Sequence, residues 1–485
     1  MLPVDTCERA RRARDARFDG RFYVGSKTTR IYCRPVCPVP PCKPENAIFF
    51  PSAAAASEAG FRPCLRCRPE AAPGSPAWVG TSATVSRALR LLADGALDGG
   101  DVEGLAARLG IGPRHLRRLF VKHVGASPLA FAQTRRILFA KKLLNETRLS
   151  MTVVADCAGF GSVRRFNEVF RRIYGRTPRE LRASDRALAR VSGIGLGVQL
   201  PFRPPFDWQA AVDFLRLRAT PGVEQVDDGV YRRTIRVRRL VGRIEITPDL
   251  SGNRLKLEVD FPDWRALSRI VQRARRIFDL DADPMVIASH LATDPLLALR
   301  LATRPGLRMV SAWDGFEATV RAILGQQVSV QVATTLAGRL AERFGEPLPQ
   351  PDGQGPHLVF PTAEAIANAE LCGIGLPAKR AHTIADVARA VTRGDLDFDA
   401  PLDAGAIVQQ LTRIPGVGQW TAQYVALRGL GEPDALPAKD LGLLRAAGNE
   451  KGAITPSQLR ERAEAWRPWR SYAAMHLWTP TRSSE

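Results

Sequence analysis

The sequence predicts a multidomain, mainly α-helical protein in which two small α+β domains alternate with helical ones. Three observations support this fold class. The chain of 485 residues is too long for one hydrophobic core. Its composition changes at two stretches typical of linkers, the Pro/Gly/Ala-rich segment 70–80 and the Pro/Gly-containing segment 191–207. Helical periodicity fills the segment between them and nearly everything after residue 284, whereas alternating apolar residues occur between 207 and 283. We therefore expect four domains, over residues 1–76, 80–184, 197–283 and 284–482.

The chain is strongly basic, with 70 Lys and Arg against 49 Asp and Glu and a net charge of +21. This excess favours a polyanionic partner, and we expect nucleic acid in preference to an acidic membrane surface. Residues 81–190 alone contain 21 basic and 9 acidic residues, more than half of the excess. The planar fork of arginine suits phosphate contacts, although a GC-rich genome would produce the same preference for arginine over lysine. Residues 191–485 are nearly neutral, so this half cannot bind a polyanion through bulk charge.

The N-terminal sequence "MLPVDTCERARRARDARF" carries charges where a signal peptide requires an apolar run, and no apolar segment of eighteen residues occurs. We expect a cytoplasmic, nucleoid-associated protein with no membrane partner. Cysteines seldom form disulfides in that compartment, so a cluster of them indicates a metal or reactive site. Cys7, Cys157 and Cys372 stand alone in the sequence and are interpreted as small buried residues.

Two cysteine pairs in the first domain have the spacing of a zinc site. Cys33 and Cys37 are separated by three residues, and Cys64 and Cys67 by two. Two closely spaced pairs commonly close four thiolates around one zinc ion, and on spacing alone a purely structural ion is the better interpretation. Cys42 lies in a proline-rich segment and fits none of the four ligand positions. It is either a spare thiol or a competing ligand.

The segments "DGRFYVGSKTTRIYCRPVCP", "PEN" and "SEAGFRPCLRCRPE" resemble the N-terminal domain of Ada proteins of the adaptive response to alkylation damage, over about residues 5 to 70. The resemblance implies that Cys33 accepts a methyl group irreversibly from a methylphosphotriester in DNA. Cys37, Cys64 and Cys67 then remain the other ligands of a single zinc ion. Zinc keeps a cysteine in the nucleophilic thiolate form, which fits this chemistry.

The basic segment contains two helix-turn-helix patterns. Residues 101–124 predict a helix capped by Asp101, a glycine-containing turn and a second helix from about Pro113. Residues 151–174 repeat the pattern with Ser162 as the cap. A solvated basic helix face is the alternative interpretation, and two units in series outweigh it. The side chains expected to face inward are Leu116, Leu119, Phe120, Phe166, Val169, Phe170 and Ile173.

The run "GFGSVRRFNEVFRRIYGRTPRELR" closely resembles the C-terminal signature of AraC-type transcription activators, and the likeness covers about residues 81 to 184. It implies that paired helix-turn-helix units contact adjacent major-groove segments of a double-stranded promoter and that RNA polymerase is a partner. The sequence alone does not separate base contacts from phosphate contacts. The candidate DNA-binding residues are Arg114, Arg117, Arg118, Arg164 and Arg165.

The segment "LTRIPGVGQWTAQYVALRGL" (411–430) predicts two helices separated by a turn with Pro415, Gly416 and Gly418. Glycines at such a turn let backbone N–H groups approach a DNA phosphate, a contact that requires little net charge. A plain helix connection is an equally good interpretation of the turn by itself. Downstream, "DALPAKDLGLLRA" places Asp440 after a proline-containing turn.

Together with "AWDGFEATVRAILGQQVSVQVA" and "WRPWRSYAAMHLW", these segments resemble the AlkA-type 3-methyladenine DNA glycosylases of the helix-hairpin-helix family, over about residues 197 to 480. The resemblance implies a small α+β domain followed by an all-α glycosylase domain that acts on damaged double-stranded DNA. Trp420, Tyr424 and Trp478 form the implied base pocket, where electron-rich rings favour a cationic alkylated base. Asp440 is the implied catalytic residue, which stabilises an oxocarbenium ion and orients or deprotonates the attacking water.

Three further features refine the prediction. Trp420 occupies the position where strand-cutting family members carry a lysine, so we expect a monofunctional glycosylase. Cys372 is the only cysteine after residue 157, so we expect no iron–sulfur cluster. In the family a side chain from the "ILGQ" loop, the wedge, fills the gap that the flipped base leaves in the DNA. Gln327 stands at this position, where some members carry leucine. The predicted function is methylphosphotriester acceptance, transcription activation and base excision in one chain. The alternative is a transcription regulator whose C-terminal half only binds DNA.

Overall fold

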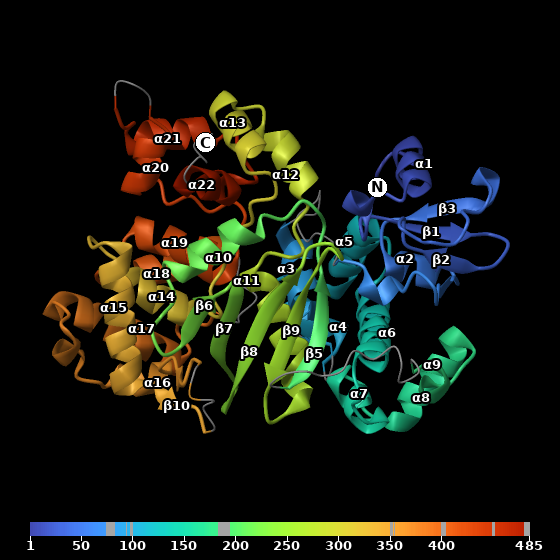
Figure 1. The fold of residues 1–485 in the computed structure, drawn as a ribbon, viewed down its shortest axis with the longest axis horizontal. Helices are drawn as coiled ribbons and strands as arrows, with labels where there is room; N and C mark the ends of the chain where they lie inside the picture. The colour runs from blue at the N-terminus through green and yellow to red at the C-terminus, as the bar shows by residue number, and fades with distance from the viewer. Residues whose placement is uncertain are drawn as a thin grey trace. The chain divides into compact units, whose positions relative to one another are not determined.

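The structure is a computed structural model whose described residues are 1–73, 83–93, 95–97, 100–182, 195–349, 353, 355–398, 404–448 and 452–479 (Figure 1). The predicted linkers 70–80 and 191–207 each contain residues outside these ranges, as do the predicted domain boundaries at 76, 80, 184 and 482. The backbone contacts divide the chain into two compact units. The first comprises residues 1–204, 249–272 and 280–283, and the second comprises 205–248, 273–279 and 284–485. Within the described ranges no helix is long and apolar enough to cross a membrane.

The N-terminal α+β domain is a four-stranded sheet in the order β3-β1-β2-β4, with helices α1 (Val4–Ala13) and α2 (Ala53–Glu58). Strand β1 (Tyr23–Ser26) pairs antiparallel with both β2 (Ile31–Cys33) and β3 (Ala47–Phe50). The short strand β4 (Arg62–Pro63) pairs parallel with β2. Aromatic side chains, among them Tyr23, Tyr32 and Phe61, fill a small core. The parallel pairing of β2 and β4 brings the ends of two strands together, and each end leads into a cysteine pair.

Among the described residues of the first unit, seven α-helices follow, α3 to α9, and they confirm the paired helix-turn-helix prediction. The first pair is α4 (Val102–Arg108) and α5 (Pro113–Val124), and the second is α7 (Met151–Cys157) and α8 (Val163–Tyr174). The hydroxyl or carboxylate of each expected cap accepts a backbone N–H: Asp101 from Gly104 at 2.7 Å and Ser162 from Arg165 at 3.2 Å. The remaining helices are α3 (Ala83–Ala93), α6 (Pro128–Glu146) and α9 (Pro178–Leu181).

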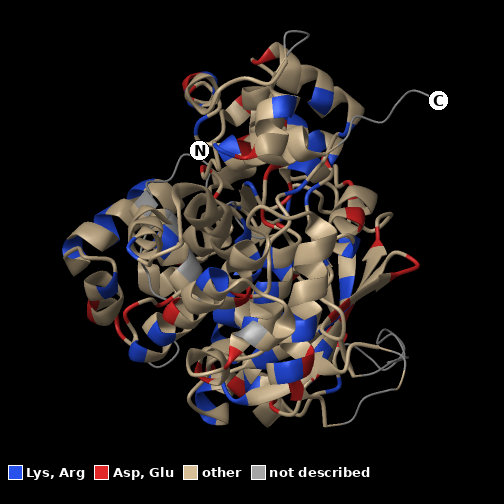
Figure 2. Cartoon of the chain, turned by 90° about the vertical axis from the view of Figure 1, so that its left-hand side faces the viewer, with Lys and Arg blue, Asp and Glu red and all other residues tan. Residues whose placement is uncertain are grey.

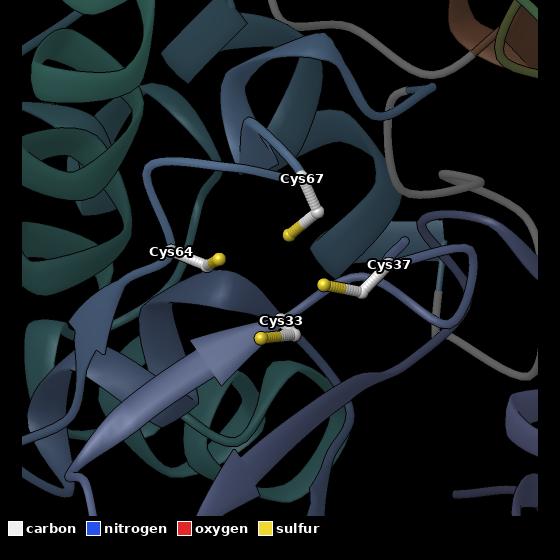
Figure 3. Close-up of side chains that lie close together, drawn as sticks. All are labelled: Cys33, Cys37, Cys64 and Cys67. Carbon is white, nitrogen blue, oxygen red and sulfur yellow. The ribbon is translucent and has the colours of Figure 1, made fainter. Parts of the chain in front are cut away.

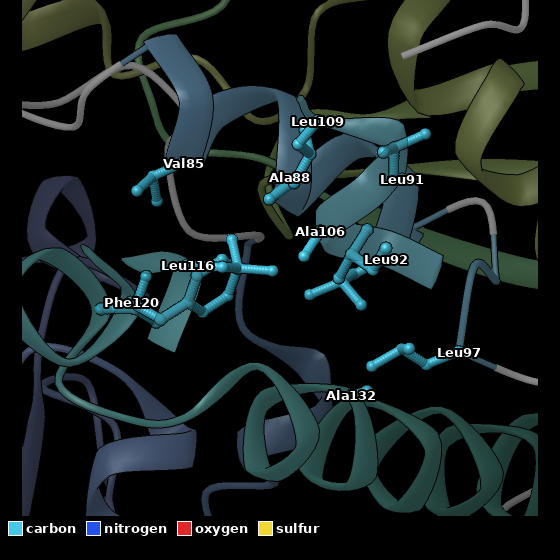
Figure 4. Packing of buried hydrophobic residues seen from close by; sticks show 12 residues of the cluster. Val85, Ala88, Leu91, Leu92, Leu97, Ala106, Leu109, Leu116, Phe120 and Ala132 are labelled. Carbon is cyan, nitrogen blue, oxygen red and sulfur yellow. The ribbon is translucent and has the colours of Figure 1, made fainter. Parts of the chain in front are cut away.

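The core of the first helix-turn-helix unit is built from α3, α4, α5 and the start of α6 (Figure 4). The predicted inward residues Leu116 and Phe120 are fully buried there, while Leu119 is only partly buried. The second unit repeats this pattern, because Phe166 and Phe170 are fully buried whereas Val169 and Ile173 are half-buried. Burial of one side of α5 and α8 leaves their basic side exposed, which is the arrangement that a groove-binding helix requires.

The strands predicted between 207 and 283 contribute to both compact units. In the first unit β9 (Arg254–Asp260) pairs antiparallel with β5 (Leu196–Pro201). The linker prediction for 191–207 is wrong over β5, because alternate residues of this segment are buried and it pairs as a strand. In the second, β6 (Glu224–Asp227), β7 (Val230–Val237) and β8 (Leu240–Asp249) form an antiparallel meander. Helix α10 (Trp208–Arg216) precedes this meander, and the 3-10 turn η5 (Trp264–Ala266) and α11 (Leu267–Ile277) follow β9.

The described remainder of the second unit consists mainly of helices and their connections, with the two-residue strands β10 (Glu346–Pro347) and β11 (Leu358–Val359). Helices α14 (Gly315–Leu324) and α19 (Gln419–Leu430) lie antiparallel at its centre, and a Cβ at Gly429 would come within 2.9 Å of Ala318. The predicted helix-turn-helix at 411–430 is confirmed as α18 (Ala404–Thr412), a turn, and α19. The remaining helices are α12 (Pro284–Leu291), α13 (Pro295–Thr303), α15 (Val330–Phe344), α16 (Ala363–Ala367), α17 (Ala378–Arg393), α20 (Leu441–Ala446), α21 (Pro456–Ala463) and α22 (Arg470–Trp478).

Candidate functional site

Four cysteine sulfurs of the N-terminal domain converge on one point. Cys33 is the last residue of β2 and Cys64 directly follows β4, while Cys37 and Cys67 lie in the turns after them. The four Sγ atoms all lie within 4.8 Å of one another and point toward a common centre (Figure 3). Sulfurs around one tetrahedral zinc ion at about 2.3 Å stand roughly 3.8 Å apart, so the four residues fit a single zinc ion.

Arg34 supports this cluster and was not among the residues predicted from the sequence. Its backbone N–H points at the Cys67 Sγ, 3.4 Å away, and its guanidinium donates to the Cys67 carbonyl oxygen at 3.0 Å. The same guanidinium forms an ion pair with the buried carboxylate of Asp19, with Nε 2.9 Å from Oδ1. Cys64 and Cys67 are buried, whereas Cys33 and Cys37 are partly exposed. The first cysteine pair is therefore the one that a large substrate can reach.

Cys42 lies outside the four-sulfur group and does not compete as a ligand in this arrangement. The Arg11 guanidinium holds its segment, donating to the Cys42 carbonyl oxygen at 2.9 Å and lying 3.8 Å from its Sγ. Cys7 and Cys157 are buried, as predicted for isolated cysteines. Burial raises the pKa of both thiols, that of Cys157 to about 12, which leaves them unreactive. The side chain of Cys372 lies outside the described part of the molecule.

The five arginines predicted to contact DNA are all exposed on the second helix of each helix-turn-helix unit. Arg114, Arg117 and Arg118 lie on α5, and Arg164 and Arg165 lie on the first turn of α8. Figure 2 shows Lys and Arg interspersed with Asp and Glu on the elements that face the viewer, so basic side chains are not confined to one element. The placement of these arginines is compatible with the predicted DNA contacts and with a solvated basic face alike.

In the second unit Asp440 accepts three hydrogen bonds among the residues of the predicted base pocket. The indole N–H of Trp420 donates to Oδ2 at 3.0 Å and that of Trp478 donates to Oδ1 at 2.9 Å. The backbone N–H of Leu443 donates to Oδ1 at 3.0 Å, so Asp440 is also the N-cap of α20. Three N–H donors fix the orientation of the carboxylate. Asp440 as a whole residue is half-buried.

The three predicted pocket aromatics form a continuous group beside this carboxylate. Trp420 and Tyr424 are one helical turn apart on α19, and their rings stack with centroids 5.4 Å apart and an interplanar angle of 22°. Trp478, from the end of α22, meets Tyr424 edge to face with centroids 6.0 Å apart. Two members of this group, Trp420 and Tyr424, are close in sequence. The third, Trp478, lies more than fifty residues further along the chain.

A cluster of arginines behind the pocket was not predicted from the sequence. Burial raises the pKa of the Tyr424 phenol, but the guanidinium groups of Arg428, Arg218 and Arg321 outweigh burial and lower it. Arg428 is itself almost fully buried and donates to the carbonyl oxygen of Val310. These arginines come from α14, α19 and the turn after α10, so no local pattern could have identified their convergence.

Two buried glutamates balance part of this positive charge. Glu224 accepts from the Tyr231 hydroxyl at 2.7 Å and from Arg321 at 2.8 Å. Glu317 accepts from Arg233 at 2.7 Å and from Arg321 at 3.0 Å. Burial raises the pKa of Glu224, but the charges of Arg321 and Arg233 overcome it and lower the pKa to about 2. The network connects the strand meander to α14 behind the aromatic group.

Of the two glycines in the hairpin turn, the fold requires glycine at only one position. Gly416 has φ +89°, and a Cβ there would lie 2.1 Å from Thr383 Oγ1, so the fold itself requires glycine. Gly418 has φ −88°, and a Cβ there would meet nothing within 4 Å. Among the described residues neither amide has a hydrogen-bond acceptor, and α19 starts without a side-chain cap. The packing of the protein therefore explains Gly416 but not Gly418.

The loop after α14 contains the predicted wedge residue. Gln327 is exposed and has φ +56°. The neighbouring Gln326, which the sequence prediction did not select, donates its side-chain amide to the Gly416 carbonyl oxygen and to Thr421 Oγ1, both at 3.0 Å. The loop and the hairpin turn are thus directly bonded.

Comparison with known families accounts for nearly the whole chain. Four family models match in order along the sequence. They are described as the metal binding domain of Ada (residues 6–70), a helix-turn-helix domain (105–184), the AlkA N-terminal domain (197–314) and the HhH-GPD superfamily base excision DNA repair protein (320–471).

A full-length relative decides the assignment. A protein of Mycobacterium tuberculosis named probable bifunctional transcriptional activator/DNA repair enzyme AlkA is 44% identical to this chain over 483 residues. The alignment covers 98% of this chain and 96% of that protein. The chain belongs to this bifunctional AlkA family. The resemblances and the mainly α, multidomain fold class predicted from the sequence are thereby confirmed.

Further comparisons concern the C-terminal half of this bifunctional AlkA family member. DNA-3-methyladenine glycosylase 2 of Escherichia coli is 37% identical over 284 residues, which cover 58% of this chain and 95% of that enzyme. The solved structure of 3-methyladenine DNA-glycosylase from Archaeoglobus fulgidus aligns with a TM-score of 0.52 and 24% identity, over 58% of this chain and 96% of that one. At that identity the structural likeness supports the fold of this half.

Proposed function

We propose that this protein responds to alkylation damage with two activities. It accepts methyl groups from DNA methylphosphotriesters on Cys33 and activates transcription, and it excises alkylated bases of the 3-methyladenine type. The observation that carries the proposal is the carboxylate of Asp440, held by the indole N–H groups of Trp420 and Trp478 beside stacked aromatic rings. The four-sulfur cluster supports the acceptor activity.

For methyl acceptance, a zinc ion bound by the four cysteines would keep them as thiolates at neutral pH. Cys33 lies at the partly exposed side of the cluster and attacks the methyl carbon of an uncharged phosphotriester. The S–C bond forms, the O–C bond breaks, and the phosphodiester anion departs without proton transfer. The product is a thioether that is not regenerated, so each chain accepts one methyl group.

Methylation also changes the charge that the cluster presents to DNA. One zinc ion and four thiolates carry a charge of −2, and methylation of Cys33 changes it to −1. Because the loss of negative charge weakens repulsion from DNA phosphates, the methylated protein binds DNA more tightly. The acceptor is in this way a permanent sensor that directs the helix-turn-helix units to a promoter, where RNA polymerase is the partner.

The acceptor proposal is tested with full-length zinc-loaded protein and duplex DNA that carries methylphosphotriesters. We expect one zinc ion per chain and transfer of one methyl group to Cys33, detected by mass spectrometry of the cysteine peptides. Cys33→Ser abolishes transfer, while Cys42→Ser is the matched control that retains it. Transfer that persists in Cys33→Ser, with the methyl group on another cysteine, would refute the assignment.

For base excision, the aromatic group binds the flipped, cationic base by stacking and cation–π attraction. The N-glycosidic bond breaks, the base leaves as a neutral molecule, and positive charge develops on the sugar. Asp440 stabilises this charge, orients the water that adds to the sugar carbon and accepts the proton that this water loses. Trp420 stands where strand-cutting relatives carry lysine, so the product is an abasic site in an intact strand. We also propose that no iron–sulfur cluster takes part.

A second candidate function is a transcription regulator whose C-terminal half only binds DNA. The backbone N–H groups of Gly416 and Gly418 favour this second function, because among the described residues they have no hydrogen-bond acceptor and could bind a DNA phosphate without any catalysis. The two functions differ in one measurement, the release of methylated base from alkylated duplex DNA by the wild-type protein. Release that is lost in Asp440→Asn supports the glycosylase, whereas DNA binding without any release supports the regulator. We infer a cytoplasmic, nucleoid-associated location for either function.

A further inference from the structure

The loop between α14 and α15 holds two adjacent glutamines in different environments. Helix α14 ends at Leu324, Gly325 is its C-cap, and α15 starts after the N-cap Ser329. Gln327 points outward with φ +56°, a left-handed conformation that is uncommon for a residue other than glycine. Such a conformation costs about 1 kcal/mol or more and persists where surrounding contacts fix it. The side-chain hydrogen bonds that join this loop to the hairpin come from Gln326.

Gln326 connects the loop to two parts of the hairpin with one side-chain amide. Its Nε2 donates to the carbonyl oxygen of Gly416 in the turn and to the hydroxyl oxygen of Thr421 in the first turn of α19, each at 3.0 Å. Thr421 is buried. The backbone of the turn is held from its other side, because Thr383 Oγ1 donates to the Pro415 carbonyl oxygen at 3.1 Å. Both acceptors of Gln326 therefore lie on a firmly held backbone.

The other end of the same helix pair is fixed by close packing. A Cβ at Gly429 would lie 2.9 Å from Ala318 Cβ and 3.2 Å from Gly315 Cα, so α14 and α19 approach closely there. This contact is at the start of α14 and the end of α19, whereas the Gln326 bonds join the end of α14 to the start of α19. The two helices are thus connected at both ends, and the orientation of the Gln327 loop depends on the Gln326 amide.

We propose that Gln326 is a positioning residue that couples the Gln327 turn to the hairpin, so that the wedge side chain and the hairpin amides engage one damaged site together. The inference rests on the proposed excision function and adds a residue to it. Gln326 acts through Gln327 and the hairpin backbone and does not contact the flipped base. The coupling requires a donor at this position, since both partners of the side chain are oxygen acceptors.

Two substitutions of Gln326 test the requirement for a donor. Gln326→Leu removes the amide, while Gln326→Glu keeps its shape but presents an acceptor to the Gly416 carbonyl. Loss of two hydrogen bonds predicts a fall of about ten- to thirtyfold in the single-turnover rate of base release. The second readout is 2-aminopurine beside an abasic-site analogue in duplex DNA, whose fluorescence rises when a side chain enters the stack. We expect a smaller rise in fluorescence in both variants. Because this measurement requires no catalysis, it reports on insertion of the side chain alone.

A double-mutant cycle with Gln327→Ala separates positioning from a general structural role. If Gln326 acts through the wedge, Gln326→Leu slows base release much less in the Gln327→Ala background than in wild type. Fully additive effects, or an unchanged fluorescence response in Gln326→Glu, would overturn the inference. If both Gln326 variants fail to fold, Thr421→Val removes one acceptor isosterically and gives the same test. Failure of the proposed function is a distinct result, because the wild-type protein itself would then release no base.

Discussion

The replacement of Asp440 by Asn separates a chemical role of this carboxylate from its structural role. A negative charge about 4 Å from a developing positive charge contributes roughly 4 kcal/mol at an effective dielectric constant of about 20. Its removal therefore predicts a loss of about a thousandfold in the rate of base release. Asn is as good an N-cap as Asp, so the start of α20 is preserved. The amide nitrogen must face one of the two indole donors, which costs about 1–2 kcal/mol of stability.

Asp294 provides a matched control in the same unit. It is also an N-cap, it accepts an indole N–H from Trp466 at 2.9 Å, and it forms an ion pair with Arg462 at 2.7 Å. Burial raises the pKa of Asp294, but Arg462 and Trp466 overcome it and lower the pKa to about 2. The charged form therefore stabilises the fold above about pH 4, and this contribution is lost as the pH falls toward 2. Asp294→Asn should cost about 2 kcal/mol of stability at pH 7 and leave base release unchanged.

The assay is single-turnover release of methylated base from duplex DNA at saturating protein, which removes differences in DNA affinity. Denaturant unfolding of the same preparations measures stability. We expect both variants to lose a similar amount of stability, about 1–2 kcal/mol for Asp440→Asn and about 2 kcal/mol for Asp294→Asn, and only Asp440→Asn to lose base release. Base release by Asp440→Asn within about threefold of wild type would refute the reasoning, since the charge would then contribute less than about 1 kcal/mol.

The remaining predictions concern the hairpin, the buried histidine, the zinc site and the basic helices. Gly416→Ala should destabilise the protein by about 2 kcal/mol or more, because the added Cβ would collide with Thr383. Gly418→Ala should leave the melting temperature nearly unchanged, because its Cβ meets nothing, and should weaken binding to duplex DNA. Burial, aided by Arg300, lowers the pKa of His476 to about 4, so stability should fall by up to about 3 kcal/mol as the pH drops from about 6.5 to 4. This decrease, followed by denaturant unfolding at each pH, should be absent in His476→Gln. Chelation of zinc should abolish methyl transfer and leave base release intact, measured on one preparation. Arg114→Ala should reduce the slope of log affinity against log salt by about one if this residue contacts phosphate, and a change in base preference at constant slope would indicate base readout instead.

Local patterns predicted a large part of the fold and of the site. The spacing of Cys33, Cys37, Cys64 and Cys67 indicated one metal site, and their sulfurs converge as expected. Caps at Asp101 and Ser162 predicted where helices begin, because a cap bonds to an amide only three residues away. The separation of four residues between Trp420 and Tyr424 predicted that their rings meet on one side of a helix. Each of these interactions depends mainly on residues close in sequence.

Other parts of the site depend on contacts between segments far apart in the chain. Asp440 and Trp478 are separated by 38 residues, and only the packing of α20 against α22 places the indole N–H on the carboxylate. Gln326 reaches the hairpin across 90 and 95 residues, so nothing near it in the sequence distinguished it from Gln327. The sequence by itself determined the domain order, the helix starts and the chemistry available, since these follow from local periodicity, capping and ligand spacing. Tertiary structure decided which donors hold Asp440, which arginines surround Tyr424 and which glutamine binds the hairpin, because those contacts form only when distant helices pack together.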